Sequence, residues 1–467
     1  MPVVGPCVSG PPGAEVSLPQ RDPVVQRRIA AAGLLKSWVA HCAALFEVRL
    51  IVATVLTGIT AGLAAMSLAL MLHSIQYLAY GFGYLSAPES FLQGVMSASP
   101  QRRATALFAA GLVAGFGWWG LARFGKDKVS VARAIGTDVA SGKTMPFFTT
   151  VIHAVLQVVT VALGSPLGRE VAPREMGALA GQLIVRRIAL APTDARVLSA
   201  CGAGAGLAAV YNVPLAGAIF TVEVLLLEAS ARTVVLALVT SVIATVTAWA
   251  GLGNVPQYVV PQFEVSGGLM LWSMLAGPIL GLGAFAFCEL TKRCERASPS
   301  GPERIVLSVL VFLGLGIAAG WFPELPGNGK GPLQLVFDGD IGYSLVGGLL
   351  LLKLLAVAGA LRAGAAGGVL TPSMAVGALA SVLLGGVWDI WLPGPSMGAY
   401  ALVGAAAFMG SALSMPLTAL VLMTELSHSG AQLIVPMVIA TGTAFAAFQM
   451  SARLKAPGAQ MCSGVAL

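Results

Sequence analysis

The sequence predicts an all-α polytopic membrane protein with two inverted structural repeats and broken, re-entrant helices. Three observations predict this class: the composition, the recurrence of long apolar segments, and a segment that occurs twice. Of 467 residues, 57% are hydrophobic and only 10% are charged, whereas soluble proteins carry about 25% charged residues. So few charges cannot cover a water-exposed surface, and lipid is therefore the expected solvent.

Apolar segments of spanning length recur along the chain. Examples are "LIVATVLTGITAGLAAMSLALML" from Leu50, "ALFAAGLVAGFGWWGLA" from Ala106 and "GLMLWSMLAGPILGLGAFAF" from Gly268. A transmembrane helix needs roughly 20 such residues. About eleven apolar stretches are present, several of them interrupted by Gly or Pro.

The chain ends predict the topology. Residues 1–45 are expected to form a cytoplasmic tail and an interfacial helix, since "QRDPVVQRR" lacks the apolar core of a signal peptide. Basic residues near both ends, Arg27 and Arg28 and then Arg453 and Lys455, place both termini in the cytoplasm. The two repeats are expected over residues 46–255 and 256–450, followed by a short cytoplasmic tail over 451–467. The net charge of +7 suits loops above anionic lipid better than nucleic acid, and the Ala/Leu/Gly-rich composition favours a bacterial inner membrane.

Metal, cofactor and enzyme functions find no support in the sequence. The six cysteines are scattered without CxxC spacing, and no HExxH motif accompanies the four histidines. "PGNGKGP" lacks a Ser or Thr after Lys330, so it predicts a loop rather than a nucleotide site. Ser373 and Ser396 have no candidate general base, so a serine hydrolase is not expected.

An internal duplication is visible in two segments that align without gaps. "GAGAGLAAVYNVPLAGAIFTVEV" from Gly202 matches "GAAAFMGSALSMPLTALVLMTEL" from Gly404, so that Pro214 pairs with Pro416 and Glu223 with Glu425. A second correspondence, at a spacing of 199, relates "GREVAP", ending at Pro173, to "GGVLTP", ending at Pro372. Duplicated halves with interrupted helices are typical of transporters, whose sites lie between the halves near the midplane.

The stretch "GSPLGREVAPREMG", Gly164–Gly177, carries four charges between apolar runs. Its Gly and Pro residues, like Gly367–Gly368 and Pro372, interrupt helices and leave new helix N-termini. Converging N-termini bind anions through free N–H groups and a partial positive charge. Glu170 is therefore a candidate gate: its carboxylate would occupy the anion site, and protonation would release it.

A structural alternative exists for the charges of this stretch. Arg169–Glu170 or Arg174–Glu175 could form ion pairs at a loop edge. For Glu170 the flanking breaks favour the gating role, while Arg174 and Glu175 are expected to be structural.

These residues resemble motifs of the CLC chloride channels and transporters. "GSPLGREVAP" is similar to that family's GREGP signature, the "GAGAGLAAVYNVPLAG" segment to its "GAAAGLAAAFNAPLAG", and "GGVLTP" to its GGIFAP. The likeness runs from about Ile51 to Met450. It implies a homodimer in the lipid bilayer with one chloride pathway per subunit, Glu170 as the gating glutamate, and no C-terminal nucleotide-sensing domains. The resemblance assigns anion binding to Gly168, Arg169, Val171, Val369 and Leu370, with Ser130 as a further candidate, and motif or structural roles to Pro173, Pro214, Glu223, Val224, Gly368 and Pro372.

The chain departs from the family pattern at three places. The Gly-Ser-Gly-Ile-Pro segment has no clean counterpart, so Ser130 and Ser141 are weak candidates for its serine, and both could be ordinary loop or helix-end serines. The C-terminal anion-contacting tyrosine is missing, its position falling near Ala456. Val224 occupies the position where proton-coupled members often carry a second glutamate.

These departures leave the transport mode open. A passive, glutamate-gated chloride channel is the leading expectation. Chloride/proton exchange is the alternative and would need another inner proton acceptor, Glu223 or water, although Glu223 is expected to bridge helix ends. A fluoride-selective member is the third possibility.

Overall fold

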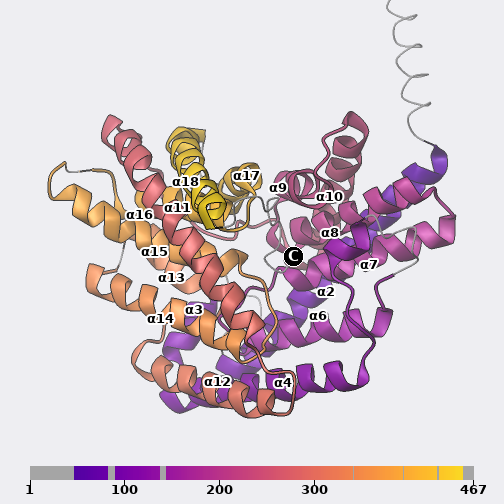
Figure 1. Ribbon diagram of the computed structural model, residues 1–467, viewed down its shortest axis with the longest axis horizontal. Helices are drawn as coiled ribbons and strands as arrows, with labels where there is room; N and C mark the ends of the chain where they lie inside the picture. Colours follow the sequence, from indigo (N-terminus) through magenta and orange to yellow (C-terminus); the bar gives the residue numbers. More distant parts are fainter. Residues whose placement is uncertain are drawn as a thin grey trace, which may run out of the picture. The chain divides into compact units, whose positions relative to one another are not determined.

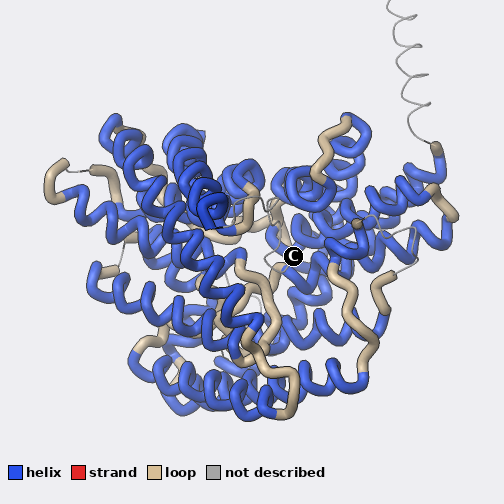
Figure 2. The backbone as a smooth tube through the Cα atoms, viewed as in Figure 1, coloured by secondary structure: helices blue, strands red, loops and turns tan. Residues whose placement is uncertain are grey.

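The computed structural model describes residues 47–81, 90–136, 144–339, 341–392, 394–428 and 431–455. From Arg49 onward the chain forms one unit. The expected N-terminal tail, Ser141 and Ala456 lie outside the described residues. Within the described chain the secondary structure is helical, without a β-strand (Figure 2).

Among the described residues, eight helices are long and apolar enough to cross a membrane, which confirms the predicted polytopic class. Their exposed surfaces carry many large apolar side chains, as expected for helices that face lipid. Figure 1 shows their arrangement, with α4 and α12 packed side by side. The eight are α2 (Val48–Tyr80), α4 (Pro100–Phe124), α10 (Ala231–Leu252), α11 (Gly267–Arg296), α12 (Glu303–Trp321), α14 (Tyr343–Arg362), α15 (Leu370–Asp389) and α18 (Ile434–Lys455).

Shorter helices fill the space between the spans. Several are too short to cross a bilayer of about 30 Å at 1.5 Å per residue, so they end within the protein. All the described helices outside the eight spans are α3 (Ser90–Ser97), α5 (Val131–Ile135), α6 (Phe147–Ala162), α7 (Val171–Ile188), α8 (Pro192–Tyr211), α9 (Pro214–Phe220) with the π-helix η2 (Thr221–Leu226), α13 (Lys330–Asp338), α16 (Met397–Ala412), α17 (Pro416–Ser427) and the 3-10 turn η3 (Ala431–Leu433).

The predicted helix breaks occur at corresponding places in the two halves. α6 ends at Ala162 and α7 begins at Val171, while α14 ends at Arg362 and α15 begins at Leu370. Each break contains a glycine with positive φ, Gly164 at 105° and Gly364 at 84°, a conformation that other residues adopt only with strain. The chain therefore reverses inside the protein, twice, in the same way.

Gly168 and Gly368 join the two breaks. Each donates its N–H to the other's carbonyl, with N···O distances of 2.7 and 3.0 Å, as an isolated antiparallel bridge. The bridge joins the corresponding breaks of the two halves, as a two-fold relation between the repeats produces. The inverted repeats predicted from the sequence thus meet at this bridge.

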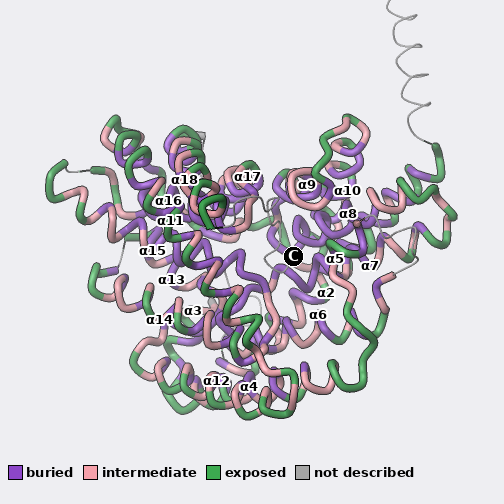
Figure 3. The backbone as a smooth tube through the Cα atoms, in the orientation of Figure 1, coloured by how far each residue is buried: buried purple, intermediate pink, exposed green. Residues whose placement is uncertain are grey.

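Small residues hold α7 tightly against α8. A methyl group on Gly177 would lie 2.0 Å from the carbonyl oxygen of Gly202, and one on Gly202 would lie 2.2 Å from that of Gly177. Such close backbone approach is the usual way in which membrane helices associate. The contact buries the first half of α7 (Figure 3) and fixes the position of its N-terminus.

Candidate anion site

Glu170 lies at the junction of the two halves, directly before the first residue of α7. Its side chain is fully buried. Oε1 accepts a hydrogen bond from the N–H of Leu370 at 2.7 Å, and Oε2 lies 3.5 Å from the hydroxyl of Tyr211. A carboxylate from one repeat therefore occupies the helix N-terminus of the other.

Two glycines make the space for this carboxylate. A methyl group on Gly368 would lie 1.9 Å from Oε1 of Glu170, and one on Gly168 would lie 2.0 Å from Oε2. No side chain fits at either position while the carboxylate is in place. The sequence indicated both glycines as helix breakers, but it did not reveal that they also border the site.

The backbone around the carboxylate suits an anion. Leu370 is the first residue of α15, with Val369 at its N-cap, and Val171 is the first residue of α7. Free N–H groups and the positive end of the helix dipole face the site at such positions. Pro173 and Pro372 stand in the first turns of these helices, where a missing N–H breaks no helical hydrogen bond.

Arg169 and Tyr211 border the site as well. The Arg169 guanidinium lies 5.3 Å from the centre of the Tyr211 ring and donates to Oε1 of Gln257 at 3.3 Å. The Tyr211 hydroxyl also lies 3.3 Å from Oγ1 of Thr371. Sequence reasoning missed Tyr211 and Thr371; the one available signal was a tyrosine at the end of a run of small residues.

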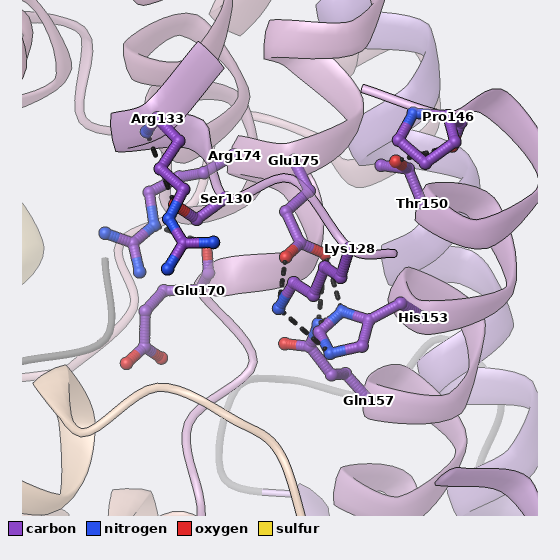
Figure 4. Close-up of polar contacts among 10 residues, drawn as sticks. All are labelled: Lys128, Ser130, Arg133, Pro146, Thr150, His153, Gln157, Glu170, Arg174 and Glu175. Carbon is purple, nitrogen blue, oxygen red and sulfur yellow. Dashed lines mark hydrogen bonds and ion pairs between the residues drawn. The ribbon is translucent and has the colours of Figure 1, made fainter. Parts of the chain in front are cut away.

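The ion pairs considered as the structural alternative, Arg169 with Glu170 or Arg174 with Glu175, are not among the salt bridges of the described chain. Arg174 donates from Nε to the carbonyl oxygen of Glu170 at 3.1 Å and lies over the Phe220 ring at 5.3 Å. Glu175 instead contacts Lys128 and His153 (Figure 4). Arg174 thus fixes the start of α7, because it ties the backbone of Glu170 to its own helix.

Ser130 caps a short helix. Its hydroxyl accepts from the N–H of Arg133 at 3.3 Å at the start of α5 (Figure 4). This matches the helix-end role considered for it, while a role in anion binding stays a prediction. The two serines considered above as nucleophiles lie at helix starts. Ser373 donates its hydroxyl hydrogen to the Leu370 carbonyl oxygen, and Ser396 is the N-cap residue of α16.

Glu223 bridges helix ends, as the sequence predicts. Its two oxygens accept from the N–H groups of Leu417 and Thr418 at 2.9 and 2.7 Å, at the start of α17, which follows Pro416. Glu425 does the same for Leu215 and Ala216 at the start of α9, which begins at Pro214, at 3.0 and 2.7 Å. Val224 follows Glu223 and is half-buried.

Together, the fold and the site define a class: an α-helical membrane protein whose inverted repeats meet at a buried carboxylate among helix N-termini. The family model described as "Voltage gated chloride channel" matches residues 104–449. The chain therefore belongs to the voltage-gated chloride channel (CLC) family and is a CLC-type chloride transport protein.

Curated relatives agree with this membership. The chain is 30% identical over 356 residues to a putative chloride channel protein ClcB-like of Ralstonia nicotianae, an alignment that covers 72% of this chain and 79% of the relative. It is 29% identical over 399 residues to the voltage-gated ClC-type chloride channel ClcB of Salmonella typhimurium, covering 81% and 91%.

Solved structures share the fold. A slow cyanobacterial Cl−/H+ antiporter superposes with a TM-score of 0.75 at 18% identity, covering 87% of this chain and 95% of that one. A CLC-type fluoride/proton antiporter gives a TM-score of 0.61 at 19% identity, covering 86% and 96%. At these identities the likeness supports the fold alone.

Proposed function

We propose that the protein conducts chloride through a pathway gated by Glu170. The observation that carries the proposal is the Glu170 carboxylate on the N–H of Leu370, because that N–H would otherwise face the anion. Carboxylate and chloride are both anions, so they compete for one cradle of N–H groups. Chloride can therefore bind there only after the Glu170 side chain has left the site.

Protonation of Glu170 allows its side chain to leave the site. A neutral carboxyl group loses most of its attraction to the positive helix end. It can then rotate away and admit chloride, whose weak multi-site binding allows it to pass. Arg169, half-buried beside the site, would raise the local concentration of anions.

We assign the site residues in these terms. Glu170 is the gate, and the N–H groups from Gly168 to Val171 and at Val369 and Leu370 contact the anion. Ser130 is proposed at the inner end of the pathway. The protein is proposed to act as a homodimer in a bacterial inner membrane, with both termini in the cytoplasm, as the family resemblance implies.

Chloride/proton exchange is the second candidate. It is favoured by the fact that a gate operated by protonation can also carry the proton. Glu223 is a poor inner acceptor, since both of its oxygens already bind N–H groups of α17. A fluoride-selective function is the third candidate, and measurement of chloride against fluoride flux separates it.

The test is chloride efflux from liposomes that contain the purified protein, recorded together with proton flux. Glu170→Gln imitates the protonated gate, so its chloride flux should no longer vary with external pH. Glu228→Gln, at an exposed position, is the matched control. If Glu170→Gln keeps the wild-type pH dependence, the gating role is wrong; uphill proton movement driven by a chloride gradient would establish exchange.

A further inference from the structure

A second buried carboxylate lies on the helix that carries the gate. Glu175 is 2% exposed and stands five positions after Glu170 on α7. Its Oε1 lies 3.0 Å from Nζ of Lys128 and its Oε2 lies 2.8 Å from Nδ1 of His153, with the amide nitrogen of Gln157 at 3.2 Å (Figure 4). Two other segments of the chain, α6 and the connection before α5, thus converge on one carboxylate.

His153 lies between the other members of this cluster. Nζ of Lys128 lies 3.1 Å from its Nε2. Its Nδ1 lies 2.8 Å from Oε2 of Glu175 and 2.7 Å from the amide nitrogen of Gln157. The imidazole thus links the exposed lysine with the buried carboxylate.

The cluster is open to water at one end only. His153 and Gln157 are buried, whereas the Lys128 side chain is 41% exposed. Oε1 of Gln157 is buried without a hydrogen-bond partner. The exposed lysine therefore separates a buried imidazole and a buried carboxylate from water.

The open end faces the N-terminal side of the membrane. α2 crosses outward from the N-terminal side and α4 crosses back, and Lys128 follows α4 directly. Arg123, Lys126, Lys128 and Arg133 crowd this connection, as the positive-inside rule requires of a cytoplasmic loop.

Arg174 connects this cluster with the gate. Its Nε donates to the carbonyl oxygen of Glu170, and it directly precedes Glu175 in the chain. Five residues of α-helix advance about 7.5 Å, so the two carboxylates stand on successive levels of one helix.

The other acidic groups are not placed to pass a proton from the N-terminal side of the membrane to Glu170. In the described chain the buried carboxylates are Glu170, Glu175 and Glu324. Glu324 belongs to the loop whose Gly327 bonds to Gly164, beside Tyr80 at the far end of α2, and so lies on the opposite side from Lys128. Glu223 is committed to the start of α17, where its oxygens accept from the N–H groups of Leu417 and Thr418.

We propose that Glu175, with His153 and Lys128, is a proton-binding site that supplies the gate Glu170 from the N-terminal side of the membrane. The proposal rests on the gating role of Glu170. The charged and titratable groups around Glu175 are His153 of α6, Lys128 before α5 and Arg174 of α7. The neighbouring faces of α2 and α8 contribute small or apolar residues, Leu68 and Leu72 and the glycine contact described above.

The proton step is simple and balanced. Lys128 swings into water and leaves Oε1 of Glu175 open. A proton from a hydronium ion binds to this oxygen, and the carboxylate becomes a carboxylic acid. Delivery of the proton to Glu170 restores the carboxylate, and the return of Lys128 closes the site again.

The experiment uses current through inside-out membrane patches that contain the full chain, with the bath on the N-terminal face. Loss of the ammonium in Lys128→Met favours protonation of Glu175, so the bath-pH midpoint should move upward by about 1 unit. Glu175→Gln should reduce the response to bath pH about tenfold or more while the response to pipette pH remains. Lys126→Met, an exposed lysine two positions away, should behave as wild type.

The outcomes separate the two proposals. If Glu170→Gln keeps its response to pH on both faces, the proposed gate fails and this inference fails with it. If Glu170→Gln loses both responses but Lys128→Met and Glu175→Gln titrate as wild type, the cluster is structural only and the inference is overturned. Should Glu175→Gln not fold, the half-exposed Lys128→Met decides the matter by itself.

Discussion

Oε1 of Glu170 lies 2.7 Å from the N–H of Leu370, a residue of the opposite repeat. The start of α7 therefore supplies the anion that the start of α15 binds. Since the two breaks are also joined by the Gly168–Gly368 bridge, neither half contains the site alone. Changes at either break should alter the same transport property.

Gly368→Ala should reduce chloride flux about tenfold or more. Its methyl group would lie 1.9 Å from the Glu170 carboxylate, and overfilling a packed site costs about 1–3 kcal/mol. Neither carboxylate nor chloride then fits on the Leu370 N–H. Liposome efflux measures the effect, and Gly314→Ala, at a position with open space within 4 Å, is the control. Equal flux in both variants would show that the anion does not pass this cradle.

Tyr211→Phe should move the pH dependence of chloride flux upward by about 0.5 unit. The Tyr211 hydroxyl lies 3.5 Å from Oε2 of Glu170 and stabilises its ionised form; without this donor the carboxylate takes up a proton at higher pH. The same efflux assay, run as a pH series, measures the midpoint. Tyr343→Phe, at an exposed tyrosine, should leave it unchanged, and a downward shift in Tyr211→Phe would contradict the assignment.

Glu223→Ala and Glu425→Ala should destabilise the protein by similar amounts. Each carboxylate caps the N-terminus of a helix in the other repeat, and loss of a cap costs about 0.5–2 kcal/mol. Thermal unfolding in detergent should show lower midpoints for both variants, with exposed Glu228→Ala as the reference. A large effect in only one of the two would argue against equivalent roles in the repeats.

Lys353→Met should destabilise the fold more strongly. The Nζ of this buried lysine donates to the carbonyl oxygens of Leu325 and Gly327. Methionine has nearly the same shape but leaves both acceptors unpaired, at about 2 kcal/mol or more. The unfolding midpoint should fall by several degrees relative to Lys126→Met, and an unchanged midpoint would mean that water replaces the ammonium.

Much of the architecture was predictable because a lipid environment allows few backbone structures. Long apolar runs can only be helices when no water is present to bind the backbone. The matching spacing of Pro214, Glu223, Pro416 and Glu425 revealed the two repeats, and the glycines and prolines located both breaks. The helix-bridging role of Glu223 followed from the same pattern.

The hydrogen-bond and ion-pair partners of the charged and polar side chains were harder to predict. Arg174 and Glu175 are adjacent in sequence, yet neighbours on a helix point about 100° apart, so they bind different groups. Lys128, His153 and Tyr211 reach their partners from distant segments, and no local spacing indicates such contacts.

The sequence by itself determined the solvent, the helices, the duplication and the candidate for the gate, because composition and spacing are local properties of the chain. The tertiary structure alone decided which N–H receives Glu170, which glycines leave room for it, and which groups surround Glu175. Those choices depend on the packing of the two repeats across their two-fold relation, and only folding brings residues some 200 positions apart into hydrogen-bond distance.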